Sequence, residues 1–254
     1  MRWQNTSLLV SLAFLGACGT TSDYNMPTSR METAEVAGRS WGGGVDLGFS
    51  GSQKVILGGL YPDVINGGNN PDINNGIEKN GTYAFNLRLG IGSRLEAVMR
   101  DRYDSPAMWG VKWQFFGAPR AERVIGWKFA VAALGGNGSA SDGSVTYSDG
   151  TSYKDDTDIR AGEGNLLAAY RMSEWVLWYA TTHAAWYDAT AKLTSNTEEL
   201  HVSGWSWQYG QAFGIELSKH IATFKLETGV VRGSVKNNES RTDLVFGSTV
   251  GLLW

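Results

Sequence analysis

The chain has 254 residues, with 22 lysines and arginines, 25 aspartates and glutamates, and a formal net charge of −3. This near balance excludes the strongly basic surface of a nucleic-acid-binding protein, so no nucleic-acid partner is expected. With 33 glycines, 11 tryptophans and only 5 prolines, the composition is typical of a membrane barrel rather than a soluble enzyme.

The first residues have the pattern of a secretory signal. Arg2 supplies the positive start, and the apolar run 8–15 follows it. Because this run is too short to span a bilayer, we expect residues 1–17 to be removed. The sequence Leu15-Gly16-Ala17-Cys18 resembles the lipobox of bacterial lipoproteins, in which the cysteine becomes the lipidated first residue. The resemblance implies lipidation at Cys18, and Gly19 in the next position favours the outer membrane.

Residues 18–39 are polar and have no apolar period, so they are predicted to form a flexible tether from Cys18. Cys18 is the only cysteine, which leaves no thiol for a disulfide, a zinc cluster or a cysteine nucleophile. The remaining residues, 40–254, are enough for one large β domain.

Ten segments of this domain alternate apolar and polar residues, the period of a β-strand. They are residues 40–50, 82–92, 94–102, 108–116, 122–134, 158–171, 174–190, 202–217, 221–234 and 241–254. Aromatic residues recur on one face, and charge and glycine recur on the other. Segment 174–190 is apolar on both faces, and the side chains assigned outward there are Val176, Trp178, Ala180, Ala184 and Trp186.

The connections between these segments alternate in length. Those after the first, third, fifth, seventh and ninth segments are mostly longer, namely 51–81, 103–107, 135–157, 191–201 and 235–240. Short turns on one rim and long loops on the other are typical of outer-membrane barrels, with the short turns in the periplasm. An even strand count predicts that the tether and Trp254 share the periplasmic rim.

These patterns predict an all-β fold, a closed antiparallel up-and-down transmembrane β-barrel of about ten strands. The alternative is a soluble β-sandwich or lipocalin-like barrel, whose apolar faces would point inward. The last strand, residues 242–254, resembles the C-terminal assembly signal of bacterial outer-membrane β-barrel proteins. The positions that carry this signal are Phe246, Val250, Leu252 and Trp254, with tryptophan in place of the commoner terminal phenylalanine. The resemblance implies two partners, outer-membrane lipids and the barrel-assembly machinery, and another envelope protein is a further candidate.

The face opposite the aromatic residues carries six acids and eight bases. They are Asp46, Arg88, Arg94, Glu96, Arg100, Lys112, Lys128, Glu163, Arg171, Glu216, Lys225, Glu227, Arg241 and Asp243. Charges inside a barrel are tolerated when they are paired or wet. A near-balanced set favours a salt-bridged plug in a narrow lumen, and the small basic excess leaves an anion-selective pore as the alternative.

His183 lies within segment 174–190 and is the candidate for catalysis, although no serine or paired aspartate motif accompanies it. His201 and His220 lie at strand ends. Loops 61–81 and 135–157 hold several aspartates without the spacing of a calcium site, so neither a metal nor a cofactor is predicted.

Three functions are therefore compared. The favoured one is a lipid-anchored outer-membrane barrel with a structural, adaptor or narrow-channel role, anchored on the periplasmic side. The others are an outer-membrane enzyme that acts on lipid or peptide through His183, and a soluble periplasmic lipoprotein that binds an apolar ligand.

Overall fold

The computed structural model describes residues 20–60, 76–140, 144–146, 152–194, 199–236 and 239–254. In these ranges the chain forms β-strands and one short 3₁₀ helix. The elements are β1 (Thr20–Pro27), β2 (Gly43–Leu60), β3 (Gly76–Gly90), β4 (Leu95–Asp101), β5 (Ala107–Phe116), η1 (Arg120–Glu122), β6 (Gly126–Ala140), β7 (Ser144–Thr146), β8 (Ser152–Arg171), β9 (Val176–Thr194), β10 (Glu199–Lys219), β11 (Ala222–Val235) and β12 (Ser240–Leu253). No helix in the described part of the chain is long and apolar enough to cross a membrane.

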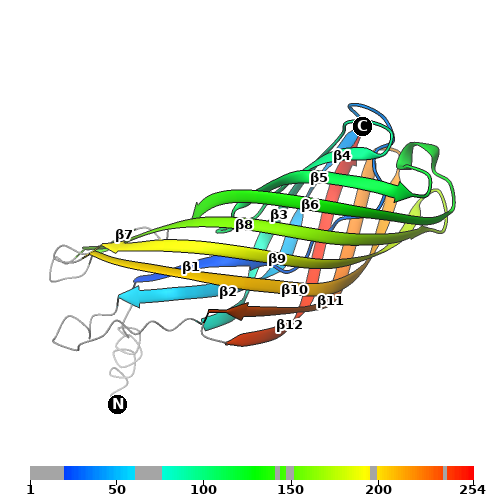
Figure 1. Ribbon diagram of the computed structural model, residues 1–254. Coiled ribbons are helices and arrows are strands. Elements are labelled where there is room, and N and C mark those ends of the chain that lie inside the picture. Colours follow the sequence, from blue (N-terminus) through cyan, green and yellow to red (C-terminus); the bar gives the residue numbers. More distant parts are fainter. Residues whose placement is uncertain (1–19, 61–75, 141–143, 147–151, 195–198, 237–238) are drawn as a thin grey trace, which may run out of the picture.

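Ten of these strands form a ring (Figure 1). Antiparallel neighbours follow the order β2-β12-β11-β10-β9-β8-β6-β5-β4-β3, and β2 also pairs with β3. The ring strands correspond one to one with the ten predicted segments, so the all-β antiparallel up-and-down fold is confirmed. Two strands are not members of the ring. Strand β7 pairs with β8, and β1 pairs with the second half of β2.

Exposure alternates along the strands as the sequence period requires. On β10, for example, Trp205 and Trp207 are exposed, whereas Ser206 and Gln208 are buried. The aromatic face therefore points outward and the polar face points into the lumen. On β9, where the sequence was apolar on both faces, Trp178 and Trp186 are exposed and the neighbouring odd-numbered residues are buried, which confirms the outward assignment.

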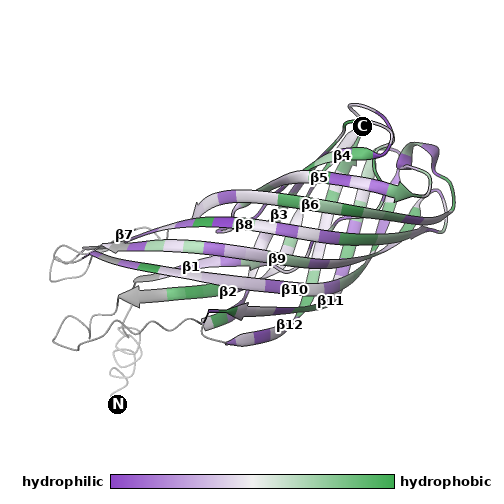
Figure 2. Ribbon diagram, in the orientation of Figure 1, coloured by the Kyte–Doolittle hydropathy of each residue, from purple (hydrophilic) through white to green (hydrophobic). Residues whose placement is uncertain are grey.

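Several strands are longer than predicted, and their extensions lie at the rim of long connections. Strand β2 continues to Leu60, β8 begins at Ser152 and β10 begins at Glu199, within segments predicted as loops. On β8 the outward residues of the extension that the structure describes include the polar Lys154 and Asp156. A strand that is wet on its outer face has no apolar alternation, so the periodicity could not reveal these extensions. Figure 2 shows hydrophobic residues gathered toward the end of the barrel where Trp254 lies.

The structure contradicts the flexible tether over most of residues 18–39. Residues 20–27 form β1, and residues 22–36 are all buried. These residues, called here the plug segment, run inside the barrel before β2 begins. Their polar composition reflects a polar lumen rather than solvent, and composition alone does not distinguish the two. Cys18 and the signal segment 1–17 lie outside the described residues.

The same path contradicts the expectation that the tether and Trp254 share a rim. Thr20 pairs with Leu60 at the end of β2 that leads into the long connection 61–75, whereas Gly43, at the other end of β2, donates a backbone hydrogen bond to Trp254 at 3.1 Å. The even strand count applies only from β2 onward. Because the plug segment first traverses the lumen, Thr20 and Trp254 lie at opposite ends of the barrel (Figure 1).

Candidate functional site in the barrel lumen

The plug segment is fastened to the barrel wall at its first residues by neutral hydrogen bonds. The Tyr24 hydroxyl lies 2.6 Å from Ser206 Oγ on β10, and Ser22 Oγ lies 2.6 Å from Thr157 Oγ1 on β8. The ring of Tyr24 also packs against Tyr187, with centroids 6.0 Å apart. These contacts cross from β1 to the opposite wall, so β1 lies within the lumen and not on the outer surface.

Farther along, Glu227 on β11 accepts three hydrogen bonds from the plug segment. The donors are Ser29 Oγ at 2.7 Å, the Arg30 amide at 2.8 Å and the Met31 amide at 2.9 Å. Backbone amides in a buried segment without sheet partners must find acceptors, since an unpaired buried N–H is costly. Glu227 therefore fixes the point where the segment leaves its pairing with β2.

The middle of the lumen holds a chain of alternating charges. Arg30 Nε lies 2.8 Å from Glu163, Glu163 lies 2.5 Å from Arg100 Nη1, and Arg100 Nη2 lies 2.9 Å from Glu32. All four side chains are nearly inaccessible to solvent. Two members come from the plug segment and two from the wall, so neither part satisfies its charges without the other.

Glu35 is the centre of a second cluster near the rim of short turns. Its carboxylate accepts hydrogen bonds from Arg171 at the end of β8, and it lies 3.7 Å from Arg120 Nε and 3.8 Å from Lys128 Nζ. Arg120 also forms a two-pronged pair with Glu216, at 2.6 and 2.9 Å. Planar guanidinium and carboxylate groups make such paired bonds especially well.

Two lysines on the wall combine an ion pair with a bond to the plug backbone. Lys112 lies 2.5 Å from Glu96 and donates to the Thr33 and Glu35 carbonyls at 3.2 and 3.1 Å. Lys225 lies 2.7 Å from Asp46 and donates to the Met31 carbonyl at 3.1 Å. Arg88 lies 3.3 Å from the same aspartate. Charged side chains of the wall thus bind the backbone of the plug segment at several positions.

Among the described residues, the charges inside the lumen balance only when the plug segment is included. The ring strands contribute six buried acids (Asp46, Glu96, Asp155, Glu163, Glu216 and Glu227) and six buried bases (Arg88, Arg100, Lys112, Lys128, Arg171 and Lys225). Arg102 and Arg120, on the connections that flank β5, add two positive charges. The plug segment carries Asp23, Glu32 and Glu35 against Arg30, a net charge of −2 that offsets them.

Eleven of the fourteen charged residues predicted to face inward are buried in the lumen. Arg94 is exposed beside the β3–β4 turn, and Arg241 and Asp243 are partly exposed and pair with each other at the far end of β12. The prediction missed Arg30, Glu32, Glu35, Arg102 and Arg120. Four of them lie outside the alternating segments, so strand parity gave no signal for them, whereas Arg102 ends the predicted segment 94–102 on its inward parity and could have been found there.

His183 faces the lumen and is 2% exposed. Neither ring nitrogen has a hydrogen-bond partner in the described structure. Proton transfer needs a partner within hydrogen-bonding reach, so the geometry gives no support to the His183-based enzyme. The described residues also contain no group of three or more histidine, cysteine, aspartate or glutamate side chains able to hold a metal ion.

The plug segment leaves little open space beside it. The cavity bounded by Arg30, Arg88 and Arg100 measures about 10 Å³, which is roughly the space for one water molecule. At this level the space beside the plug segment holds little more than a water molecule.

No protein-family model matches the sequence, and no curated protein matches it. Two crystal structures of Ail, the attachment invasion locus protein of Yersinia pestis, resemble the barrel, and one of them is a complex with the heparin analogue sucrose octasulfate. Their sequence identities are 12% and 14% and their TM-scores 0.37 and 0.35, over 85% and 84% of this chain and 99% of each Ail chain. Because both TM-scores are low, no function is inferred from them.

Replacing Glu35 with glutamine tests whether the plug segment stabilises the barrel. The Glu35→Gln variant leaves Arg171 buried without its carboxylate, which is expected to lower the free energy of unfolding by about 3–5 kcal/mol. The measurement is urea unfolding of the full chain in detergent micelles, followed by tryptophan fluorescence. Glu199→Gln is the matched control, since Glu199 pairs with Lys192 on the exposed surface and its loss should leave the midpoint unchanged. Equal midpoints for both variants would show that the pairing in the lumen is not stabilising.

Proposed function

We propose that this protein is an outer-membrane β-barrel of the bacterial envelope whose lumen is closed by its own N-terminal segment. Its role is structural or that of an adaptor, rather than that of an open channel. The observation that carries the proposal is the plug segment itself, buried along its whole length and ion-paired to the wall at Glu163, Arg100 and Arg171.

The outer surface supports a membrane location. Trp109, Trp178 and Trp207 are each about half exposed, with fractions of 58%, 51% and 49%, and they belong to a continuous outward face of large apolar residues. Soluble proteins rarely expose apolar patches larger than a few hundred Å². In lipid these apolar side chains are not exposed to water, whereas in the soluble lipoprotein alternative they would be.

The height of the apolar band fits a bilayer. On β10 the outward residues from Trp205 to Leu217 are large and apolar except for Gln211, and outward Ser203 and His201 lie beyond them. The twelve steps between Trp205 and Leu217, at about 3.3 Å each and tilted by about 40°, cover roughly 30 Å of depth, close to the hydrocarbon thickness of a bilayer. The strand extensions then project beyond the membrane at the rim of long connections.

The last strand supports assembly into a membrane. Phe246, Val250, Leu252 and Trp254 all point outward and are about half exposed or more. The proposed assembly signal is therefore on the face that lipid and the barrel-assembly machinery would contact.

The proposed orientation changes the side on which a lipid anchor would lie. With short turns in the periplasm, Thr20 lies at the cell-surface rim, because it pairs with Leu60 near the long connections. Cys18 precedes Thr20 by two residues, a reach of roughly 7 Å. A lipid on Cys18 would then anchor the chain at the cell surface, and not on the periplasmic side as the sequence suggested.

An arginine on the outer face tests the membrane location. Phe213→Arg places a charge within the apolar band of β10 and is expected to destabilise the barrel in lipid vesicles by about 2–4 kcal/mol. Ser203→Arg is the control, since it adds the same side chain on the same face of the same strand beyond the band. Vesicle-reconstituted protein would be unfolded with urea and followed by tryptophan fluorescence. A barrel that tolerates both variants equally does not have this face in lipid.

Planar-bilayer recording tests the closed lumen. Wild-type protein is expected to show no steady conductance, because the plug segment fills the lumen. The full-length variant with Arg30→Ala, Glu32→Ala and Glu35→Ala removes the ion pairs of the plug segment and is expected to show discrete openings. Heat-modifiable migration in gels verifies that the variant still forms a barrel. Steady conductance of the wild-type protein would contradict the proposal in favour of a channel.

Epitope accessibility in intact cells tests the direction of the plug segment. A tag inserted between Gly19 and Thr20 is expected to be labelled by antibody without permeabilisation. A tag in the β8–β9 turn, at Ser173, is expected to need permeabilisation of the outer membrane. The reverse pattern would show that the barrel is inserted the other way round.

A further inference from the structure

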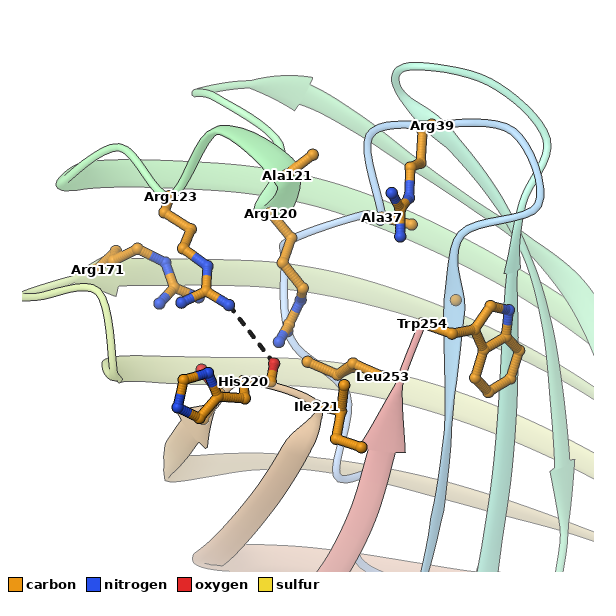
Figure 3. Close-up of a pocket in the computed structure, with 12 residues that line it drawn as sticks. Ala37, Arg39, Arg120, Ala121, Arg123, Arg171, His220, Ile221, Leu253 and Trp254 are labelled. Carbon is orange, nitrogen blue, oxygen red and sulfur yellow. Dashed lines mark hydrogen bonds between the residues drawn. The ribbon is translucent and has the colours of Figure 1, made fainter.

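A pocket of about 270 Å³ opens at the rim of short turns, beside Trp254 (Figure 3). Four arginines and one histidine line it: Arg39, Arg120, Arg123, Arg171 and His220. They come from four separate places, namely the loop before β2, η1 with the residue after it, the end of β8 and the β10–β11 turn. The lining includes no aspartate or glutamate side chain.

The cations of this pocket differ in how far they are neutralised. Arg120 and Arg171 are held from within the lumen by Glu35 and Glu216. Arg39 and Arg123 are exposed, and no ion pair joins either of them to a carboxylate in the described structure. Arg123 donates one hydrogen bond to the His220 carbonyl, at 3.5 Å, which leaves most of its donors free.

Two of the lining residues are held in backbone conformations that suit other residue types. Arg123 has φ of 49° and His220 has φ of 52°, in the left-handed region that glycine and asparagine adopt more easily. Residues other than glycine that hold such backbone conformations are concentrated at ligand sites, where the surrounding structure maintains them. Here they bring the Arg123 side chain over the His220 carbonyl at the edge of the pocket (Figure 3).

One side of the pocket is apolar. Ile221 and Trp254 are 62% and 48% exposed, and Leu253 lies between them in the lining. The Trp254 indole is fixed by a hydrogen bond to the Trp41 carbonyl at 3.0 Å. A ligand in this position would meet guanidinium groups on one side and apolar side chains on the other.

We propose that this pocket binds a phosphate ester, and that its source is the headgroup of an anionic phospholipid in the leaflet at this rim. Guanidinium groups pair with phosphate oxygens in a planar, two-pronged geometry, with a charge on both partners. The volume exceeds that of inorganic phosphate and leaves space for the alcohol of a headgroup. The lipid source rests on the proposed function, whereas the recognition of phosphate itself depends only on the pocket.

The test titrates purified full-length protein in zwitterionic detergent with three probes: inorganic phosphate, glycerol phosphate and short-chain phosphatidylglycerol. Binding is measured by calorimetry and by the phosphorus chemical shift. The test variant is Arg39→Gln with Arg123→Gln, which leaves the ion pairs of the lumen intact. The matched control is Arg160→Gln with Arg232→Gln, two exposed arginines on β8 and β11 outside the pocket.

Wild-type protein is expected to bind phosphatidylglycerol more tightly than glycerol phosphate, and the test variant to lose roughly tenfold or more in affinity while the control keeps it. Equal affinity for the two phosphate esters would support the pocket but overturn the lipid source. Absence of binding, or the same loss in the control, would overturn the pocket. If the protein binds glycerol phosphate but tolerates Phe213→Arg in vesicles, the phosphate pocket is supported and only the proposed membrane location is contradicted.

Discussion

The rest of the structure depends on the ion pairing between the plug segment and the barrel wall. A charge moved out of water is costly unless an opposite charge and hydrogen bonds replace its hydration. In this lumen the replacements come from two parts of the chain that are distant in sequence: Arg30, Glu32 and Glu35 on one side, and Glu163, Arg100 and Arg171 on the other. Each part makes the burial of the other tolerable.

This dependence links the interior of the barrel to its proposed role. A wall with the additional charges of Arg102 and Arg120 would form a basic pore, but the plug segment carries the compensating negative charge and occupies the space. Under the proposed function, the interactions that stabilise the barrel are the same ones that close it. A channel would require these ion pairs to break, whereas a structural or adaptor protein retains them.

The outside and the inside of the barrel meet at the rim of short turns. Glu35 neutralises Arg171 and contributes to the neutralisation of Arg120 from the lumen, while Arg39 and Arg123 stay uncompensated above them. Beside these cations, Trp254 and Ile221 continue the apolar outer surface. The rim thus combines free positive charge with apolar side chains. These are the two properties that suit a protein surface to an anionic lipid, whose headgroup is charged and whose chains are apolar.

The sequence by itself determined the ten ring strands and which of their faces points outward, because side-chain alternation is a local property of a strand. It also located most charges of the wall, from Asp46 to Glu227, by the same parity. Only the tertiary structure decided the path of residues 20–36, since polar residues without a period suit a solvated tether and a polar lumen equally. The pairing of Glu35 with Arg171 and the opposite positions of Thr20 and Trp254 follow from that path. Both depend on contacts between residues far apart in the chain, which no local pattern encodes.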